Sequence, residues 1–251
     1  MNEKLDPEEV ESIMSRIKAE AVKIVESHGG IVNQFVGDEV LALFGIPTTH
    51  EDDPRRAVTA ALELHRLARD LGAEVEPRIG APLRMHTGIN TGLVVTHLRD
   101  DREGRYGITG DSVNTAARLV SRADPDEILL SPDTRRLVAP FFDLEELAPV
   151  AVKGKARPMV SYRVVGASGI ATRFEAAEER GFTPHTGREA ELATLHGALE
   201  RASGGHGQFV TVSGEAGLGK SRLLHEFRHS LDREACTIIQ GRCQSFGGAT
   251  P

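Results

Sequence analysis

The chain has 251 residues, of which 39% are hydrophobic and 27% are charged, a composition typical of globular proteins. Its net charge of −7 and its pI near 5.8, without a basic stripe, argue against a nucleic-acid partner. The sequence contains no run of about 18 apolar residues, so it predicts no transmembrane span. The acidic N-terminus is unlike a signal peptide. We therefore expect a cytoplasmic protein with no membrane partner.

The first elements are a helix and a hairpin. Asp6-Pro7-Glu8-Glu9 predicts a helix start, because a capping carboxylate precedes a proline and two acids in the first turn. Apolar residues then recur at helical spacing as far as Gly29-Gly30. Residues 30–44 alternate in polarity on either side of Gly37-Asp38, which predicts a β-hairpin with its turn at that pair.

A second helix and two strands are expected next. Asp53-Pro54 predicts the helix start, and small or apolar residues follow at helical spacing. Leu83–Ile89 alternates as a strand, and Gly92–His97 is predicted to be its successor. The histidines in this region lack the spacing of metal ligands, so we assign them to packing or to the surface.

The segment Arg105–Arg118 carries the strongest functional pattern. A strand breaks at Gly110-Asp111 and runs into a helix from Ser112 to about Ala123, on which Asn114 and Arg118 share one face. An amide and a guanidinium beside a helix N-terminus suit a phosphoester anion. On these residues alone, an exposed helix with a solvated polar face is an equal alternative.

The remaining elements of the first domain are short. We predict a strand at Ile128–Leu130, a helix at about Pro132–Val138 and a hairpin that closes with Val160–Val165. Mixed hairpins and helices of this kind indicate an α+β sandwich. The only two cysteines, Cys236 and Cys243, are interpreted as idle thiols in a reducing compartment.

Several of these stretches together resemble the catalytic domain of the class III nucleotidyl cyclases. They are residues 29–45, 85–92, 105–118 and Val152-Lys153-Gly154-Lys155, and they occur in the order of the family. The resemblance covers residues 1–165 and implies a ferredoxin-like α+β fold. The family's first strand, which lies between the strands matching Val40–Phe44 and Leu83–Ile89, is expected to be missing from this chain.

The resemblance implies cyclisation of a purine nucleoside triphosphate, with two metal ions, Mg²⁺ or Mn²⁺, assisting the displacement of pyrophosphate from the α-phosphate. It implies that Asp38 binds metal and that Lys153 faces the terminal phosphates. Asn114 would orient the ribose, and Arg118 would stabilise charge at the α-phosphate. The family acts as a homodimer, so Asp38 is expected on one side of a shared cleft and Asn114 and Arg118 on the other.

The chain departs from the family at three positions. The base-reading position holds Gln34, an amide that donates and accepts, and its partner position holds Gly107. ATP is the expected substrate, and GTP stays open. The family's other metal-binding aspartate belongs to the expected missing strand, so we expect residues 1–251 alone to be inactive or strongly impaired as a cyclase.

Residues 166–186 are predicted to be a linker, and a second domain is predicted over residues 187–251. There, the predicted strand Gln208–Ser213 precedes a loop with glycines, a lysine and a serine at the spacing of a phosphate-binding loop, and a helix from Lys220 to about Leu231 follows. The predicted phosphate-binding residues are Gly214, Gly217, Gly219, Lys220 and Ser221. The Ser221 hydroxyl is the expected magnesium ligand.

The second domain resembles the start of an AAA-like signal-transduction ATPase, an α/β P-loop NTPase that binds ATP. One further strand is predicted at about Thr237–Arg242, and the chain is expected to be a piece of a larger cyclase-ATPase. Two functional hypotheses remain. The protein is a nucleotidyl cyclase in intracellular signalling, or its first domain is a degenerate cyclase-homology module that regulates or dimerises a signalling ATPase.

Overall fold

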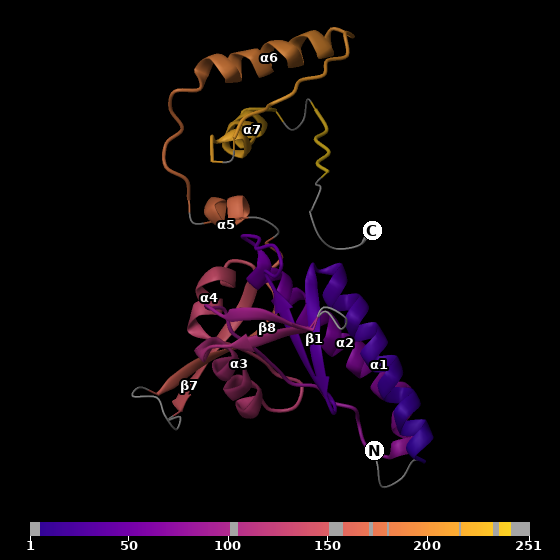
Figure 1. The fold of residues 1–251 in the computed structure, drawn as a ribbon. Coiled ribbons are helices and arrows are strands. Elements are labelled where there is room, and N and C mark those ends of the chain that lie inside the picture. The colour runs from indigo at the N-terminus through magenta and orange to yellow at the C-terminus, as the bar shows by residue number, and fades with distance from the viewer. Residues whose placement is uncertain are drawn as a thin grey trace. The chain divides into compact units, whose positions relative to one another are not determined.

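The computed structural model describes residues 6–100, 105–150, 158–170, 173–179, 181–215, 217–232 and 236–241. The chain divides into two compact units, one ending at Gly169 and the other running from Ile170 to Cys243 (Figure 1). Each unit is described by itself. None of the described helices combines the length and the apolar character that a membrane span requires.

The first unit begins with a helical layer over a hairpin. Helices α1 (Pro7–Ser27) and α2 (Asp53–Ile79) lie along the hairpin of β1 (Gly30–Val36) and β2 (Glu39–Phe44) (Figure 1). Buried side chains of both helices pack on the apolar face of that hairpin. The main members of this core are Ala21, Val25, Leu64, Val32, Ala42 and Phe44. The predicted start of each helix and the predicted hairpin turn are confirmed, but the Asp6 carboxylate, at the N-cap of α1, forms no capping hydrogen bond among the described residues.

The second layer of this unit is a mixed four-stranded sheet in the order β3-β6-β8-β7. β3 (Thr87–Ile89) and β6 (Ile128–Leu130) are parallel, whereas β8 (Met159–Ala167) pairs antiparallel with both β6 and β7 (Phe142–Val150). Helices α3 (Asp111–Arg122) and α4 (Pro132–Val138) complete the layer. The buried residues here are Leu119, Ile128, Leu129, Leu130 and Val138. The predicted α+β architecture is therefore confirmed for the first unit.

Strand β4 (Val95–Asp100) and strand β5 (Arg105–Thr109) form a separate antiparallel pair. The strand predicted over Leu83–Ile89 is reduced to β3, because only three of its residues find a ladder partner, on β6. Among the described residues no ladder joins β2 to β3, the two strands that the family resemblance expects to share a neighbour.

The second unit consists of helices α5 (Arg173–Glu179), α6 (Glu189–Ser203) and α7 (Lys220–His229). The prediction of a strand at Gln208–Ser213 is wrong, because the structure has no strand there. The prediction of a strand at Thr237–Arg242 is also wrong for residues 237–241, the part that the structure describes. A strand exists only where a second strand accepts its hydrogen bonds, and neither segment has such a neighbour among the described residues. Within the predicted linker, α5 forms and Phe174 packs against Phe182 and against His225 of α7.

Candidate functional site

The β1–β2 turn carries the predicted metal-binding carboxylate. Gly37 has φ +62°, a left-handed conformation that glycine adopts without a steric penalty, and Asp38 follows it at the exposed tip of the hairpin. Among the described residues the Asp38 carboxylate forms no hydrogen bond or ion pair. It is therefore available to a hard divalent cation, which prefers carboxylate oxygens.

Strand β1 is joined to strand β5 by one buried side chain. The Asn33 Nδ2 donates to the Tyr106 carbonyl oxygen over 3.1 Å, and the Tyr106 backbone N–H donates to Asn33 Oδ1 over 2.9 Å. Asn33 is only 4% exposed and sits at the β1 bulge, where the register with β2 shifts. Gln34 follows Asn33, and Gly107 follows Tyr106. This pair of hydrogen bonds therefore brings the two predicted base-reading segments together.

Helix α3 carries the residues that are predicted to contact the ribose and the α-phosphate, Asn114 and Arg118. Gly110 precedes the helix with φ +146°, and Asn114 and Arg118 lie one turn apart, with Asn114 exposed. The Arg118 Nη1 is buried and has no hydrogen-bond partner among the described residues. Since burial of an unpaired donor on a charged group is costly, this nitrogen is suited to an incoming anion.

The N-terminal half of α3 is held in place by contacts that the sequence pattern did not reveal. Asn90 Nδ2 donates to the Ser112 carbonyl over 3.0 Å, and Ser112 Oγ donates to the Leu93 carbonyl over 2.8 Å. At Gly88 a Cβ atom would lie 2.6 Å from the Ala116 carbonyl oxygen, so β3 and α3 are in backbone contact there. The Met85–Gly92 motif therefore positions the helix that carries Arg118.

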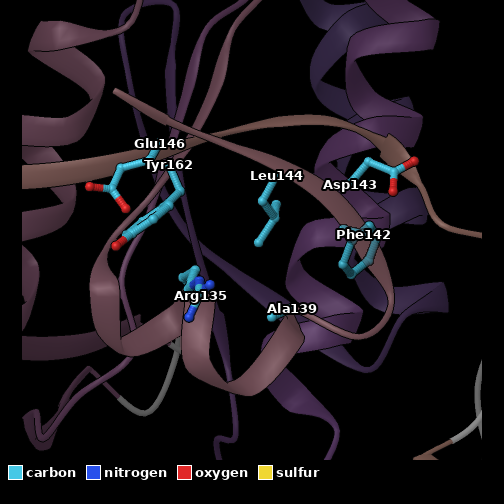
Figure 2. Close-up of a pocket in the computed structure, with 7 residues that line it drawn as sticks. All are labelled: Arg135, Ala139, Phe142, Asp143, Leu144, Glu146 and Tyr162. Atoms are coloured by element: carbon cyan, nitrogen blue, oxygen red, sulfur yellow. The ribbon is translucent and has the colours of Figure 1, made fainter. Parts of the chain in front are cut away.

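Of the predicted cyclase residues, Lys153 lies outside the described residues. No hydrogen bond or ion pair among the described residues joins Asp38 to Asn114 or Arg118. A hollow of about 250 Å³ lies elsewhere, on β7, β8 and α4, and Figure 2 shows Tyr162 and Glu146 on adjacent strands at its wall. None of its lining residues belongs to the predicted set. They are Arg135, Ala139, Phe142, Asp143, Leu144, Glu146 and Tyr162.

The predicted phosphate loop in the second unit wraps around its lysine. Lys220 Nζ donates to the carbonyl oxygens of Gly214 and Glu215, both over 2.7 Å. Gly217 and Gly219 have φ values of +85° and +82°, which favour glycine. The loop leads directly into α7, whose first two residues are Lys220 and Ser221, as the motif requires.

Residues 1–166 match the sequence model of the adenylate and guanylate cyclase catalytic domain. The chain belongs to this cyclase family. Residues 184–251 match the AAA ATPase domain. Both resemblances stated above are thereby confirmed.

Solved structures support the cyclase fold. The adenylyl cyclase CyaB of P. aeruginosa is 32% identical with a TM-score of 0.59, over 65% of this chain and 86% of that one. The guanylyl cyclase Cya2 is 31% identical with a TM-score of 0.61, over 68% of this chain and 87% of that one. Similar cyclases therefore include one named for each purine base.

One relative spans both units. An uncharacterised protein of Rhizobium meliloti is 30% identical over 245 residues, which make up 97% of this chain and 23% of that protein. The chain spans about a quarter of the length of the first curated relatives that it matches.

Proposed function

We propose that the cyclase unit converts a purine nucleoside triphosphate into a cyclic nucleotide and pyrophosphate in intracellular signalling. The observation that carries this proposal is the buried Nη1 of Arg118, which has no hydrogen-bond partner among the described residues. A phosphate oxygen would satisfy that nitrogen, and a fixed guanidinium there would stabilise charge that develops at the α-phosphate. Asn114, one helical turn earlier, would hold the ribose. Lys153 would face the terminal phosphates.

Asp38 would hold the divalent metal. The carboxylate fits Mg²⁺ or Mn²⁺, since it is exposed at the hairpin tip and unpaired among the described residues. The bound metals would supply charge stabilisation for the attacking and leaving oxygens. As Asp38 is the one metal carboxylate that the resemblance assigns to this chain, we expect residues 1–251 alone to form little product.

The site is proposed to be completed between two copies of the chain. In a two-fold dimer each subunit gives different residues to two equivalent sites. The absence of any hydrogen bond from Asp38 to Asn114 or Arg118 among the described residues is consistent with this arrangement. Asp38 would come from one subunit, and Asn114 and Arg118 from the other.

Gln34 and Gly107 would face the base. The Gln34 amide offers both a donor and an acceptor, and Gly107 offers no side chain, so this pair tolerates either purine. We propose ATP as the preferred substrate, and the AAA ATPase domain of the same chain would take ATP as well. In that domain Lys220 would contact the phosphates and Ser221 would hold magnesium. We propose a cytoplasmic location, where these nucleotides are available.

The test is formation of cyclic AMP and cyclic GMP from ATP and GTP with Mg²⁺ or Mn²⁺. It uses residues 1–251 and an extended version to which an upstream apolar strand carrying an aspartate has been added. Arg118→Ala should lower the rate of the active version by roughly 10²–10³-fold, since it removes one preorganised electrostatic group. Ser121→Ala is the matched control, because Ser121 Oγ donates to the Ala117 carbonyl of the same helix and to no other group in the described part of the chain. Undiminished turnover in Arg118→Ala would overturn the assignment.

The second hypothesis is a degenerate cyclase module that senses nucleotide or dimerises a signalling ATPase. Gln34 and Gly107 favour it, because neither is the residue that the family uses to read a base. It predicts that the extended version binds a triphosphate through Arg118 and forms no cyclic product. ATP hydrolysis by a chain that carries both domains would then change when Arg118 is replaced.

A further inference from the structure

The second unit contains a cluster of one carboxylate and two imidazoles away from the phosphate loop. Glu178 comes from α5, and His225 and His229 lie one turn apart on α7. Ligand atoms from all three lie within 4.8 Å of one another. We propose that Glu178, His225 and His229 form a binding site for Zn²⁺ or a similar borderline divalent transition metal.

The distances suit a tetrahedral ion. Glu178 Oε1 lies 3.5 Å from His225 Nδ1 and 3.9 Å from His229 Nε2. Zinc bonds of about 2.0–2.2 Å in a tetrahedron place ligand atoms roughly 3.3–3.6 Å apart. Small side-chain movements would therefore close the three ligands on one ion, with water as the fourth ligand.

His225 supplies an independent reason to expect a ligand. It is 8% exposed, lying against Phe174 and Phe182, and its Nδ1 has no hydrogen-bond partner among the described residues. That nitrogen points to the cluster, because Glu178 Oε1 is 3.5 Å away. Leaving a buried polar atom unsatisfied is costly, and a metal bond would remove this cost.

His229 is held in the form that a metal needs. Its Nδ1 lies 3.0 Å from the His225 carbonyl oxygen, to which only a protonated nitrogen donates. In the neutral ring this bond leaves the lone pair on Nε2, the atom that faces Glu178.

A simple ion pair accounts less well for this geometry. The two imidazole rings have centroids 3.9 Å apart, so protonation of both would set two positive charges against each other. A divalent ion bound by one carboxylate and two neutral imidazoles removes this repulsion. It would also fix α5 to α7, the helix that continues from the phosphate loop.

The experiment titrates Zn²⁺ by calorimetry, and Co²⁺ by its tetrahedral absorption, into chelator-treated residues 1–251 without nucleotide. Wild type should bind one ion that His229→Ala and Glu178→Gln bind at least about 10-fold more weakly. Zn²⁺ should also raise the melting temperature of wild type, and a chelator should reverse the rise. His206→Ala, in an exposed turn of the same unit, is the control and should match wild type.

Equal stoichiometry and affinity in wild type, His229→Ala and Glu178→Gln would overturn the proposal and assign any bound zinc to other residues. Absence of a tetrahedral Co²⁺ spectrum in wild type would overturn it too. Glu178→Gln keeps the shape of the side chain, so it decides the question if His229→Ala fails to fold. Nucleotide turnover plays no part in these measurements, so the outcome is independent of the proposed cyclase function.

Discussion

At Gly88 the absence of a side chain sets the distance between β3 and α3. A Cβ atom there would lie 2.6 Å from both the Ala116 carbonyl oxygen and the Val120 backbone nitrogen. Backbone atoms of a helix cannot move aside as a flexible side chain can. The position of Arg118 therefore depends on a residue that offers no chemistry of its own.

Gly88→Ala should destabilise the first unit by about 1–3 kcal/mol or more, as overpacking of a core does. Urea unfolding followed by circular dichroism measures this. Gly166→Ala is the control, because a Cβ atom at Gly166 of β8 meets nothing within 4 Å and its stability should stay within about 0.5 kcal/mol of wild type. Equal stability of the two variants would contradict the close contact.

His65 makes the stability of the first unit depend on pH. It is 3% exposed, its Nε2 lies 2.9 Å from Thr87 Oγ1, and burial lowers its pKa to about 4. The unfolded chain, with a His65 pKa near 6.5, binds the proton more readily. The contribution of His65 is therefore fully present above pH 6.5 and is lost as the pH falls toward 4.

The free energy of unfolding should fall by about 3 kcal/mol from this group between pH 6.5 and pH 4. His65→Gln keeps a hydrogen-bonding group near Thr87 but does not titrate, so its pH dependence should be shallower by that amount. Urea melts across this pH range measure the difference. Parallel pH profiles for wild type and His65→Gln would show that His65 titrates alike in both states.

Among the elements, those with local signals are the ones that could be predicted from sequence. Asp53-Pro54 starts α2 and Gly37-Asp38 turns the first hairpin, because caps and turns depend on neighbouring residues alone. β3 is shorter than expected, and Gln208–Ser213 is not a strand, because a strand depends on a distant partner. Apolar alternation shows that a segment suits a sheet, not that a partner is present.

One substitution tests whether the predicted phosphate loop binds ATP. Lys220→Ala should abolish ATP binding by this loop, because it removes the charge that the Gly214 and Glu215 carbonyls now hold while the backbone amides remain. Calorimetry with ATP and Mg²⁺ measures the loss. His206→Ala again serves as the control, and undiminished binding in Lys220→Ala would place the nucleotide elsewhere.

For the whole molecule, the sequence could predict which residues belong to the candidate site, but not which distant segments the fold brings together there. The sequence predicts roles for Asp38, Asn114 and Arg118 because the motifs that contain them are local, and these roles stay predictions. The bond from Asn33 to Tyr106 spans 73 residues, and no local pattern indicates it. The proposed metal site was not predicted from the sequence, because Glu178 lies in a segment predicted to be a linker.

A site shared between subunits predicts complementation. In the active, extended version, Asp38→Ala and Arg118→Ala should each be inactive, and an equimolar mixture should regain about a quarter of wild-type activity. Half of the dimers would then be mixed, and one of the two sites in each mixed dimer would have both residues intact. Cyclic-nucleotide formation after subunit exchange measures this, and a mixture as inactive as its parts would place the site within one chain.

The Asn33–Tyr106 bond also has a consequence for the order of folding. The hairpins β1–β2 and β4–β5 each close locally, whereas this bond closes a loop of 73 residues, which is slower and entropically more costly. The two hairpins should thus form before they join. In stopped-flow experiments Asn33→Ala should speed unfolding and leave the folding rate nearly unchanged. The approach of the segment that carries Gln34 to the segment that carries Gly107 would be among the last native features to appear and the first to be lost.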